Sequence, residues 1–296
     1  MKFEGIMTAM VTPLDENGVI VEESFRELIR FQIKHQVQNI LILGGTGEYT
    51  KLNLEEKKRA IDIAVSEVNG CIPVVVGIIS PGLNEAIELG KYSKLAGAEA
   101  IMVVTPYYGI PTQKGLKEYY QEIDQAVGMP LILYNIPYRT NVNLLPESVE
   151  ELVQKIPNIV GIKECTPNMG QVVNLIRRVG DKIVVLCGEE FFAVSEFIIG
   201  AKGAVMASAN IIPDVWVKMW RLVNEKDYDV AVKMNEDYFP FFNAIFSELH
   251  PGPLKVAMQM FGLPAEKLSA PLVAPSENTI IALKESMKEL GMINNV

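Results

Sequence analysis

The chain has 296 residues, of which 49% are hydrophobic and 21% charged, a composition that supports a large apolar core. Its formal charge is −9, from 27 basic and 36 acidic residues without a basic cluster, which argues against nucleic acid or an anionic membrane as a partner. The three cysteines share no close spacing and the first residues lack a signal-peptide pattern, so we expect a cytoplasmic protein.

Short apolar runs rich in β-branched residues alternate with longer amphipathic segments. The short runs predict strands at residues 6–11, 39–43, 72–77, 100–105, 131–134, 159–163, 183–187 and 204–207. The amphipathic segments predict helices at about 22–36, 54–68, 83–96, 113–127, 146–156, 170–179, 190–199 and 215–224. Strands that alternate with helices pair in parallel, and these units favour an α/β fold, a (β/α)8 TIM barrel, over an open doubly wound sheet.

The last part of the chain differs from this alternation. Residues 225–296 read as helical segments broken by prolines. We therefore expect a barrel catalytic domain at 1–224 and a C-terminal helical region at 225–296 that packs on the barrel. No stretch approaches about 18 uninterrupted apolar residues, so we expect no membrane span.

Lys163 stands out because it ends an apolar run, Ile-Val-Gly-Ile-Lys at 159–163, that has the composition of a buried strand. Burial disfavours the ammonium form, lowers the pKa of the amine and leaves more of it free to form a Schiff base with a carbonyl. The same pattern fits a structural lysine at a strand end that reaches solvent or pairs with Glu164.

Other unusual residues follow other strands, and in a barrel the ends of the strands carry the function. Residues 44–48 read Gly-Gly-Thr-Gly-Glu, which is either an ordinary turn or a nest of free N–H groups that holds an anion. Tyr108 follows the fourth strand, and Tyr134 and Arg139 lie at the end of the fifth. Tyr134 could equally be a core aromatic residue, and Arg139 a solvated loop charge. Together with Lys163 they suit a 2-oxo acid, which needs imine formation, proton transfer and a carboxylate clamp.

At this point the chain resembles a known family, the pyruvate-dependent class I aldolases typified by dihydrodipicolinate synthase and N-acetylneuraminate lyase. Four motifs recur in order: Gly-Gly-Thr-Gly-Glu at 44–48, Val-Thr-Pro-Tyr-Tyr at 104–108, Tyr-Asn-Ile-Pro at 134–137 and Gly-Ile-Lys-Glu at 161–164. The resemblance covers about residue 5 to at least residue 273.

The resemblance implies a role for each matching residue. Lys163 would form the Schiff base, and Tyr134 would donate and accept protons at the imine and enamine. Tyr108 would reach into a neighbouring subunit's site as part of a proton relay. Arg139, which the sialic acid lyases lack, would hold the carboxylate of the second substrate. The implied substrate-binding residues that remain are Gly45, Thr46, Gly188 and Val205, of which Thr46 with neighbouring amides would hold the first carboxylate.

The implied function is a cytoplasmic Schiff-base lyase acting on pyruvate or a related 2-oxo acid. The synthase reaction, pyruvate with aspartate semialdehyde in lysine biosynthesis, is favoured; alternatives are a 2-keto-3-deoxy sugar acid aldolase or dehydratase, and a barrel that only binds a 2-oxo acid. We expect small-molecule 2-oxo acid and aldehyde substrates, no cofactor beyond the covalent imine through Lys163, and a homotetramer built as a dimer of dimers. With two distant histidines, His35 and His250, we expect no metal site.

The sequence also departs from the synthase pattern. Gly45 stands where the synthases usually carry a threonine that links the two tyrosines of the relay, and some sugar-acid dehydratases share the glycine. Pro81 replaces an asparagine that contacts the inhibitor in lysine-regulated synthases, and Tyr49 replaces a smaller residue of that pocket. Glu85 and Tyr107 do match that pocket. On balance we expect free L-lysine not to inhibit this protein.

Overall fold

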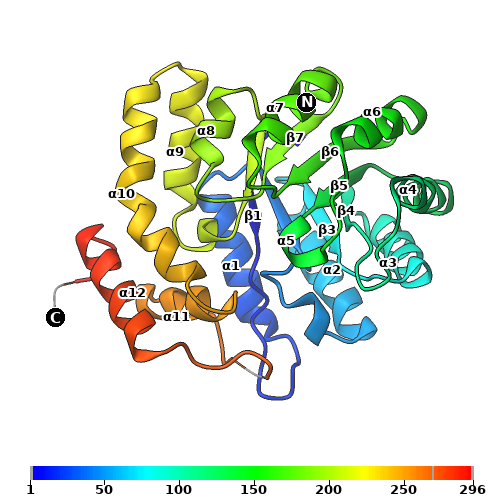
Figure 1. The fold of residues 1–296 in the computed structure, drawn as a ribbon. Coiled ribbons are helices and arrows are strands. Elements are labelled where there is room, and N and C mark those ends of the chain that lie inside the picture. Colours follow the sequence, from blue (N-terminus) through cyan, green and yellow to red (C-terminus); the bar gives the residue numbers. More distant parts are fainter. Residues whose placement is uncertain (1–2, 269, 295–296) are drawn as a thin grey trace.

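A computed structural model describes residues 3–268 and 270–294 of the chain. Eight parallel strands pair in chain order and close into a barrel, which confirms the predicted (β/α)8 architecture (Figure 1). The strands are β1 (Gly5–Ala9), β2 (Asn39–Ile42), β3 (Val74–Ile78), β4 (Ala100–Val104), β5 (Leu131–Asn135), β6 (Ile159–Glu164), β7 (Val184–Cys187) and β8 (Gly203–Met206).

Helices follow the strands and surround the barrel. They are α1 (Glu22–Lys34), α2 (Leu54–Val68), α3 (Leu83–Ala96), α4 (Gln113–Val127), α5 (Pro137–Thr140), α6 (Pro146–Lys155), α7 (Met169–Val179), α8 (Ala193–Ile198) and α9 (Pro213–Asn224), with short 3-10 turns at Tyr49–Lys51 and Ser208–Asn210. The helices α2, α3 and α4 have the predicted bounds. The side chain of Asn53 accepts a hydrogen bond from the Glu56 N–H at the start of α2, and Gly97 and Gly128 end α3 and α4 in the left-handed conformation.

Several predicted boundaries were wrong by one to three residues. The first strand was predicted at 6–11 but lies at Gly5–Ala9, and the eighth helix was predicted from residue 190 but begins at Ala193. Glu190 is not helical because its carboxylate accepts hydrogen bonds from the backbone of Ala207 and Ser208 at the end of β8. The one-turn helix α5, which begins with Pro137 directly after β5, was not predicted.

The strands divide the apolar core into two parts. Side chains that point into the barrel form a small inner cluster that includes Met7, Leu41, Val104 and Leu186, whereas a larger cluster fills the layer between strands and helices. Because side chains alternate along a strand, Tyr134 belongs to the inner cluster and its neighbour Asn135 points outward. This alternation decides which end-of-strand residues face the top of the barrel.

The C-terminal part forms three further helices, α10 (Tyr228–Phe246), α11 (Gly252–Phe261) and α12 (Glu277–Glu289). In Figure 1 these yellow-to-red helices lie on the side of the barrel away from α3 and α4, and α10 lies next to α8 and α9. Trp216 of α9 stacks on Phe242 of α10 at 5.2 Å between ring centroids, and Phe242 and Leu254 belong to the same large core cluster as the barrel's outer layer. The C-terminal helices therefore share their core with the barrel.

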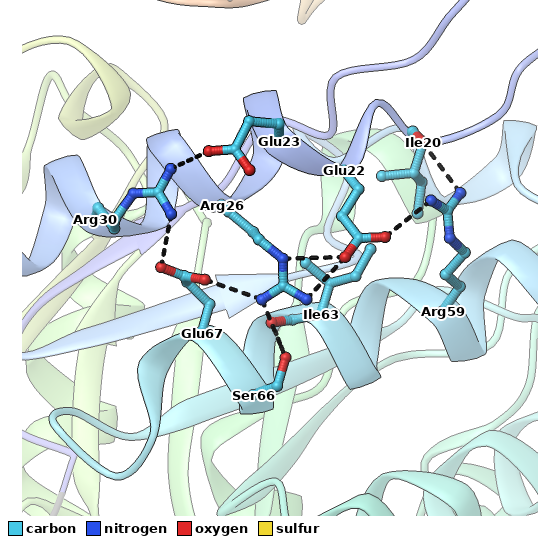
Figure 2. A network of polar contacts seen from close by, with 9 residues as sticks. All are labelled: Ile20, Glu22, Glu23, Arg26, Arg30, Arg59, Ile63, Ser66 and Glu67. Atoms are coloured by element: carbon cyan, nitrogen blue, oxygen red, sulfur yellow. Dashed lines mark hydrogen bonds and ion pairs between the residues drawn. The ribbon is translucent and has the colours of Figure 1, made fainter.

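An ion-pair network ties α1 to α2 on the outside of the barrel (Figure 2). Arg26 of α1 lies between Glu22 and Glu67 with contacts of 2.8 and 2.9 Å, and Arg59 of α2 reaches back to Glu22 at 3.1 Å. Arg30 also contacts Glu67, at 3.0 Å. These partly exposed pairs connect the two helices and add modest stability. No helix within residues 3–268 or 270–294 combines the length and apolar character that crossing a membrane needs.

Candidate active site

A cavity of 370 Å³ opens at the carboxyl ends of the barrel strands. It brings together seven of the eight residues that the sequence singled out, and these are Gly45, Thr46, Tyr134, Arg139, Lys163, Gly188 and Val205. They come from the ends of β2, β5, β6, β7 and β8. The eighth residue, Tyr108, is not among the residues that line this cavity.

Lys163 and Tyr134 form the floor of the cavity. They lie side by side on β6 and β5, and their side chains are 8% and 7% exposed. The Lys163 Nζ lies 3.4 Å from the Tyr134 hydroxyl and 4.5 Å from the centre of its ring. Glu164 points the other way and accepts hydrogen bonds from Asn135 and from the N–H of Thr166. The alternative that Lys163 pairs with Glu164 or extends to solvent does not describe this structure.

The prediction that burial lowers the pKa of Lys163 was wrong in its net direction. Burial does lower that pKa, but the electrostatic interactions of the amine with Tyr134, Cys165 and Glu189 outweigh it, so the pKa of Lys163 lies above its ordinary value. Burial raises the pKa of Tyr134 to about 12, an effect that the charge of Lys163 partly offsets. The resting site at neutral pH therefore contains an ammonium beside a neutral phenol.

Gly188 gives Lys163 its space. A Cβ at this position would lie 2.1 Å from the Cys165 Sγ and 2.8 Å from the Lys163 Cε, far inside van der Waals contact. Any side chain at 188 would displace the lysine or the thiol. Val205 of β8, 2% exposed, forms part of the apolar wall of the cavity.

The glycine-rich loop is only partly the nest of free amides that the sequence suggested. The N–H groups of Gly47 and Glu48 donate to the carbonyls of Gly44 and Gly45, at 3.1 and 3.2 Å. Among the hydrogen bonds of the described residues, none uses the N–H of Gly45 or Thr46. Two amides therefore remain for an anion, beside the hydroxyl of Thr46.

The rim of the cavity is exposed. Arg139 lies in α5 above the floor, and its charge acts on Tyr134, Glu189 and His250. Tyr138, the residue before it, donates a hydrogen bond to Glu189 at 2.7 Å across the mouth. Tyr108 is 95% exposed and has a positive φ of 69°, so its side chain projects away from this barrel.

Sequence reasoning missed three residues around the cavity. His250 lines it and contacts Thr46, at 3.0 Å between the Thr46 Oγ1 and the ring Nε2. Glu189 raises the pKa of Lys163, and Glu190 lines the wall. The two glutamates follow the seventh strand directly, so the rule that strand ends carry function could have found them. His250 lies far along the chain, and no local pattern marks it.

Within the described residues no group of three or more His, Cys, Asp or Glu side chains is arranged to hold a metal ion. The polar groups of the cavity are an amine, phenols, hydroxyls, a guanidinium and backbone amides. Such groups bind and transform a small carboxylate with a carbonyl group, by covalent catalysis through the amine.

Residues 2–290 match the Dihydrodipicolinate synthetase family. The 4-hydroxy-tetrahydrodipicolinate synthases of Thermodesulfovibrio yellowstonii and Syntrophobacter fumaroxidans are 41% and 39% identical to this chain, each over 98% of it and over 99% and 100% of their own length. The chain belongs to this family. It is accordingly a lyase of the class I aldolase type, as the motif resemblance implied.

Solved structures of the family agree with the fold in detail. The chloride-inhibited dihydrodipicolinate synthase from Acinetobacter baumannii, complexed with pyruvate, has a TM-score of 0.94 at 34% identity, and the match covers 98% of this chain and 99% of that one. The family fold thus extends through the C-terminal helices, and the connection between α10 and α11 supplies His250 to the cavity.

Proposed function

We propose that this protein is a 4-hydroxy-tetrahydrodipicolinate synthase that joins pyruvate to aspartate semialdehyde through an imine on Lys163. The observation that carries the proposal is the buried contact between Lys163 and Tyr134 on the floor of a cavity whose rim bears Arg139. The full-length relatives named for this activity support it.

The first half of the reaction takes place on the floor. Lys163 passes one proton through Tyr134 to the ketone oxygen, the free amine attacks the carbonyl carbon, and loss of water leaves a protonated imine, so no net proton has to leave the site. Tyr134 moves protons between the nitrogen and the departing oxygen, because its hydroxyl lies within reach of Nζ. The free amides of Gly45 and Thr46, with the Thr46 hydroxyl, hold the carboxylate.

The second half takes place at the rim. Tyr134 accepts a methyl proton of the imine and gives its own proton to the aldehyde oxygen as the resulting enamine carbon attacks the aldehyde. Arg139 holds the carboxylate of that second substrate. Tyr108 points away from its own barrel, which suits a residue that serves the site of a neighbouring subunit. We therefore propose a homotetramer, a dimer of dimers, in the cytoplasm. Each subunit would consist of a barrel domain at 1–224 and a helical region at 225–296 that packs on it. The enzyme would use no cofactor.

One observation favours a second candidate, a 2-keto-3-deoxy sugar acid aldolase or dehydratase. Nothing lies within 4 Å of a Cβ placed on Gly45, so the loop has room for the threonine that the synthases usually carry. The space around position 45 therefore does not require a glycine, and the difference from the synthases is the missing threonine hydroxyl. Without that hydroxyl, the link between the two tyrosines needs a water molecule or a different route.

Coupled turnover with pyruvate and a panel of aldehydes separates the candidates. The panel contains aspartate semialdehyde, succinic semialdehyde as a carboxylate without the amine, and glyceraldehyde as a short sugar aldehyde. We expect aspartate semialdehyde to give the highest kcat/KM. Faster turnover of the sugar aldehyde would select the second candidate, and imine formation without turnover of any aldehyde would indicate a binding protein.

A further inference from the structure

His250 lies in the wall of the cavity although it comes from the C-terminal helical region. Its ring stacks on Phe246, with 5.0 Å between centroids and 25° between planes. Its Nε2 lies 3.0 Å from the Thr46 hydroxyl, whereas its Nδ1 is buried and has no hydrogen-bond partner among the described residues. The ring therefore has a single polar contact, and that contact is to a proposed substrate-binding residue.

The ring is neutral at physiological pH. Burial, followed by the positive charges of Arg139 and Lys163, lowers the pKa of His250 to about 3. A neutral imidazole has one N–H, which lies on Nε2 or on Nδ1. The position of this hydrogen decides whether the Thr46 hydroxyl donates or accepts the hydrogen bond to the ring, because Nε2 contacts Thr46 and Nδ1 has no partner among the described residues.

If Nδ1 carried the hydrogen, a buried N–H would have no partner, and the Thr46 hydroxyl would donate its hydrogen bond to Nε2. The hydroxyl would then face a substrate carboxylate with lone pairs alone. If Nε2 carries the hydrogen, it donates to the Thr46 Oγ1, and the hydroxyl hydrogen is free for an anion. Orphaned buried N–H donors are rarer than orphaned acceptors, so the second arrangement is favoured.

We propose that His250 is a positioning residue that donates its Nε2–H to Thr46 and so directs the Thr46 hydroxyl to the carboxylate of the 2-oxo acid. This inference rests on the proposed function, which assigns that carboxylate to Thr46. In this proposal the C-terminal region takes part in substrate binding, because its side chain His250 leaves the Thr46 hydroxyl free to donate a hydrogen bond to the carboxylate.

The structure fixes both partners of this contact. On one side, the Thr12 hydroxyl donates to the Gly47 carbonyl at 2.8 Å and holds the loop that carries Thr46. On the other, a buried ion pair of 2.8 Å joins Glu48 of that loop to Lys255 of α11, which begins two residues after His250. The loop and the C-terminal helices are thus held together where His250 meets Thr46.

The variant His250→Phe tests the proposal because it keeps an aromatic ring on Phe246 and removes the donor. We expect its KM for pyruvate to rise roughly tenfold to a hundredfold, as for loss of a hydrogen bond to a charged group, while kcat falls much less. Borohydride trapping of acetone, a ketone without a carboxylate, should be as efficient in the variant as in the wild type. A fall in acetone trapping equal to the fall with pyruvate would overturn the proposal.

A double variant separates positioning from a general structural role. Thr46→Val should raise the KM for pyruvate by a similar factor, and Thr46→Val with His250→Phe should be no worse than Thr46→Val alone, because the histidine acts through the threonine. Losses that multiply would contradict the inference. If wild-type protein itself traps no pyruvate at Lys163, the proposed function fails instead, so the two failures are distinguishable.

A measurement on the unaltered enzyme covers the case in which His250→Phe does not fold. NMR of histidine labelled with a nitrogen isotope reports the tautomer of each neutral ring, and the chain has only two histidines to assign. We expect the Nε2–H form for His250 in the presence of pyruvate. The Nδ1–H form would contradict the proposal.

Discussion

The floor and the rim of the cavity are built differently. On the floor, Lys163 and Tyr134 are almost completely buried and lie on adjacent strands whose backbone hydrogen bonds fix their register. On the rim, Tyr138 is 58% exposed and shares the one-turn helix α5 with Arg139. The floor is part of the barrel, whereas the rim belongs to the connections that follow its strands.

This difference suggests a division of labour. Covalent chemistry at a 2-oxo acid needs an amine and a phenol at a fixed separation in a site with little water, and strands supply that. Selection of the second substrate needs groups that can vary without disturbing the barrel, and loops supply that. Changes to the floor should therefore abolish all reactions, and changes to the rim should alter only the choice of aldehyde.

The largest effect is expected for Lys163→Arg. A guanidinium stays protonated and cannot form an imine, so activity should fall by at least roughly 10³-fold with every aldehyde. Lys57→Arg is the matched control, since Lys57 is also buried but pairs with Glu85 at 2.8 Å outside the cavity. Steady-state assays measure this loss. Activity that survives in Lys163→Arg would contradict imine formation at Lys163.

Tyr134→Phe should have the next largest effect. The ring and its packing remain, and only the hydroxyl beside Nζ is lost, so we expect kcat to fall roughly 10²- to 10³-fold, as for loss of a general acid–base group. Tyr120→Phe serves as control, because the hydroxyl of Tyr120 is buried but donates to the Val103 carbonyl in the outer layer. Equal losses in the two variants would point to stability instead of proton transfer.

At the rim, Arg139→Ala should lower kcat/KM for aspartate semialdehyde about tenfold to a hundredfold, because a charged hydrogen bond contributes ~1.5–3 kcal/mol. The concentration of pyruvate that half-saturates imine formation should hardly change. Arg221→Ala removes an arginine whose side chain is 63% exposed and provides the control. Normal use of aspartate semialdehyde by Arg139→Ala would make Arg139 a solvated charge.

A smaller effect concerns how the free energy of unfolding depends on pH through the buried Glu196. Glu196 of α8 is fully buried next to the Cys187 thiol, and burial raises its pKa from 4.5 to about 8. The folded state then binds a proton that the unfolded state releases above pH 4.5, so the free energy of unfolding should fall as pH rises towards 8.

Urea unfolding at several pH values checks this. Glu196→Gln should flatten the fall by up to ~1.4 kcal/mol per pH unit, and the exposed Glu118→Gln should leave it unchanged. Burial also raises the pKa of Glu164 and of Glu190 to about 7, and both add dependence of the same sign. An identical slope in wild type and Glu196→Gln would show that Glu196 is not the group that titrates.

The smallest expected effect is that of free L-lysine, which should not inhibit the protein. In this structure Glu85 already accepts hydrogen bonds from Lys57 at 2.8 Å, Ser80 at 2.9 Å and Tyr49 at 3.1 Å. A free amino acid would have to displace these partners. Titration into steady-state assays checks it: half-inhibition below about a millimolar would contradict this reading of the pocket. Lys57→Ala removes the charged partner of Glu85 and tests whether this ion pair is what prevents inhibition.

The fold was predictable because each of its units is local. Alternating short apolar runs and amphipathic segments predicted the barrel, and caps such as Asn53 and Gly97 located helix ends to the residue. What failed were features fixed by distant contacts: the helix expected at residue 190 starts late because Glu190 binds the end of β8. Strand ends therefore pointed to the cavity, but His250, which reaches it through tertiary packing, carried no signal.

The electrostatics of the site were also beyond the sequence. Burial of Lys163 was predictable from its apolar run, but the opposing effect of Tyr134, Cys165 and Glu189 depends on how three strand ends converge. The loop at 44–48 likewise looked like a nest of amides, yet Gly47 and Glu48 use theirs within the turn. Residue types predict which groups are present, and only geometry decides which of them remain available.

The most direct test of the account is borohydride reduction in the presence of pyruvate, followed by peptide mass mapping. We expect inactivation together with a pyruvate-derived mass on the peptide that contains Lys163, and no such mass without pyruvate. The buried Lys57 and Lys255 provide internal controls in the same digest, and both should stay unmodified. An adduct on a different lysine, or no adduct in an enzyme that turns over pyruvate, would contradict the assignment of Lys163 as the Schiff-base residue.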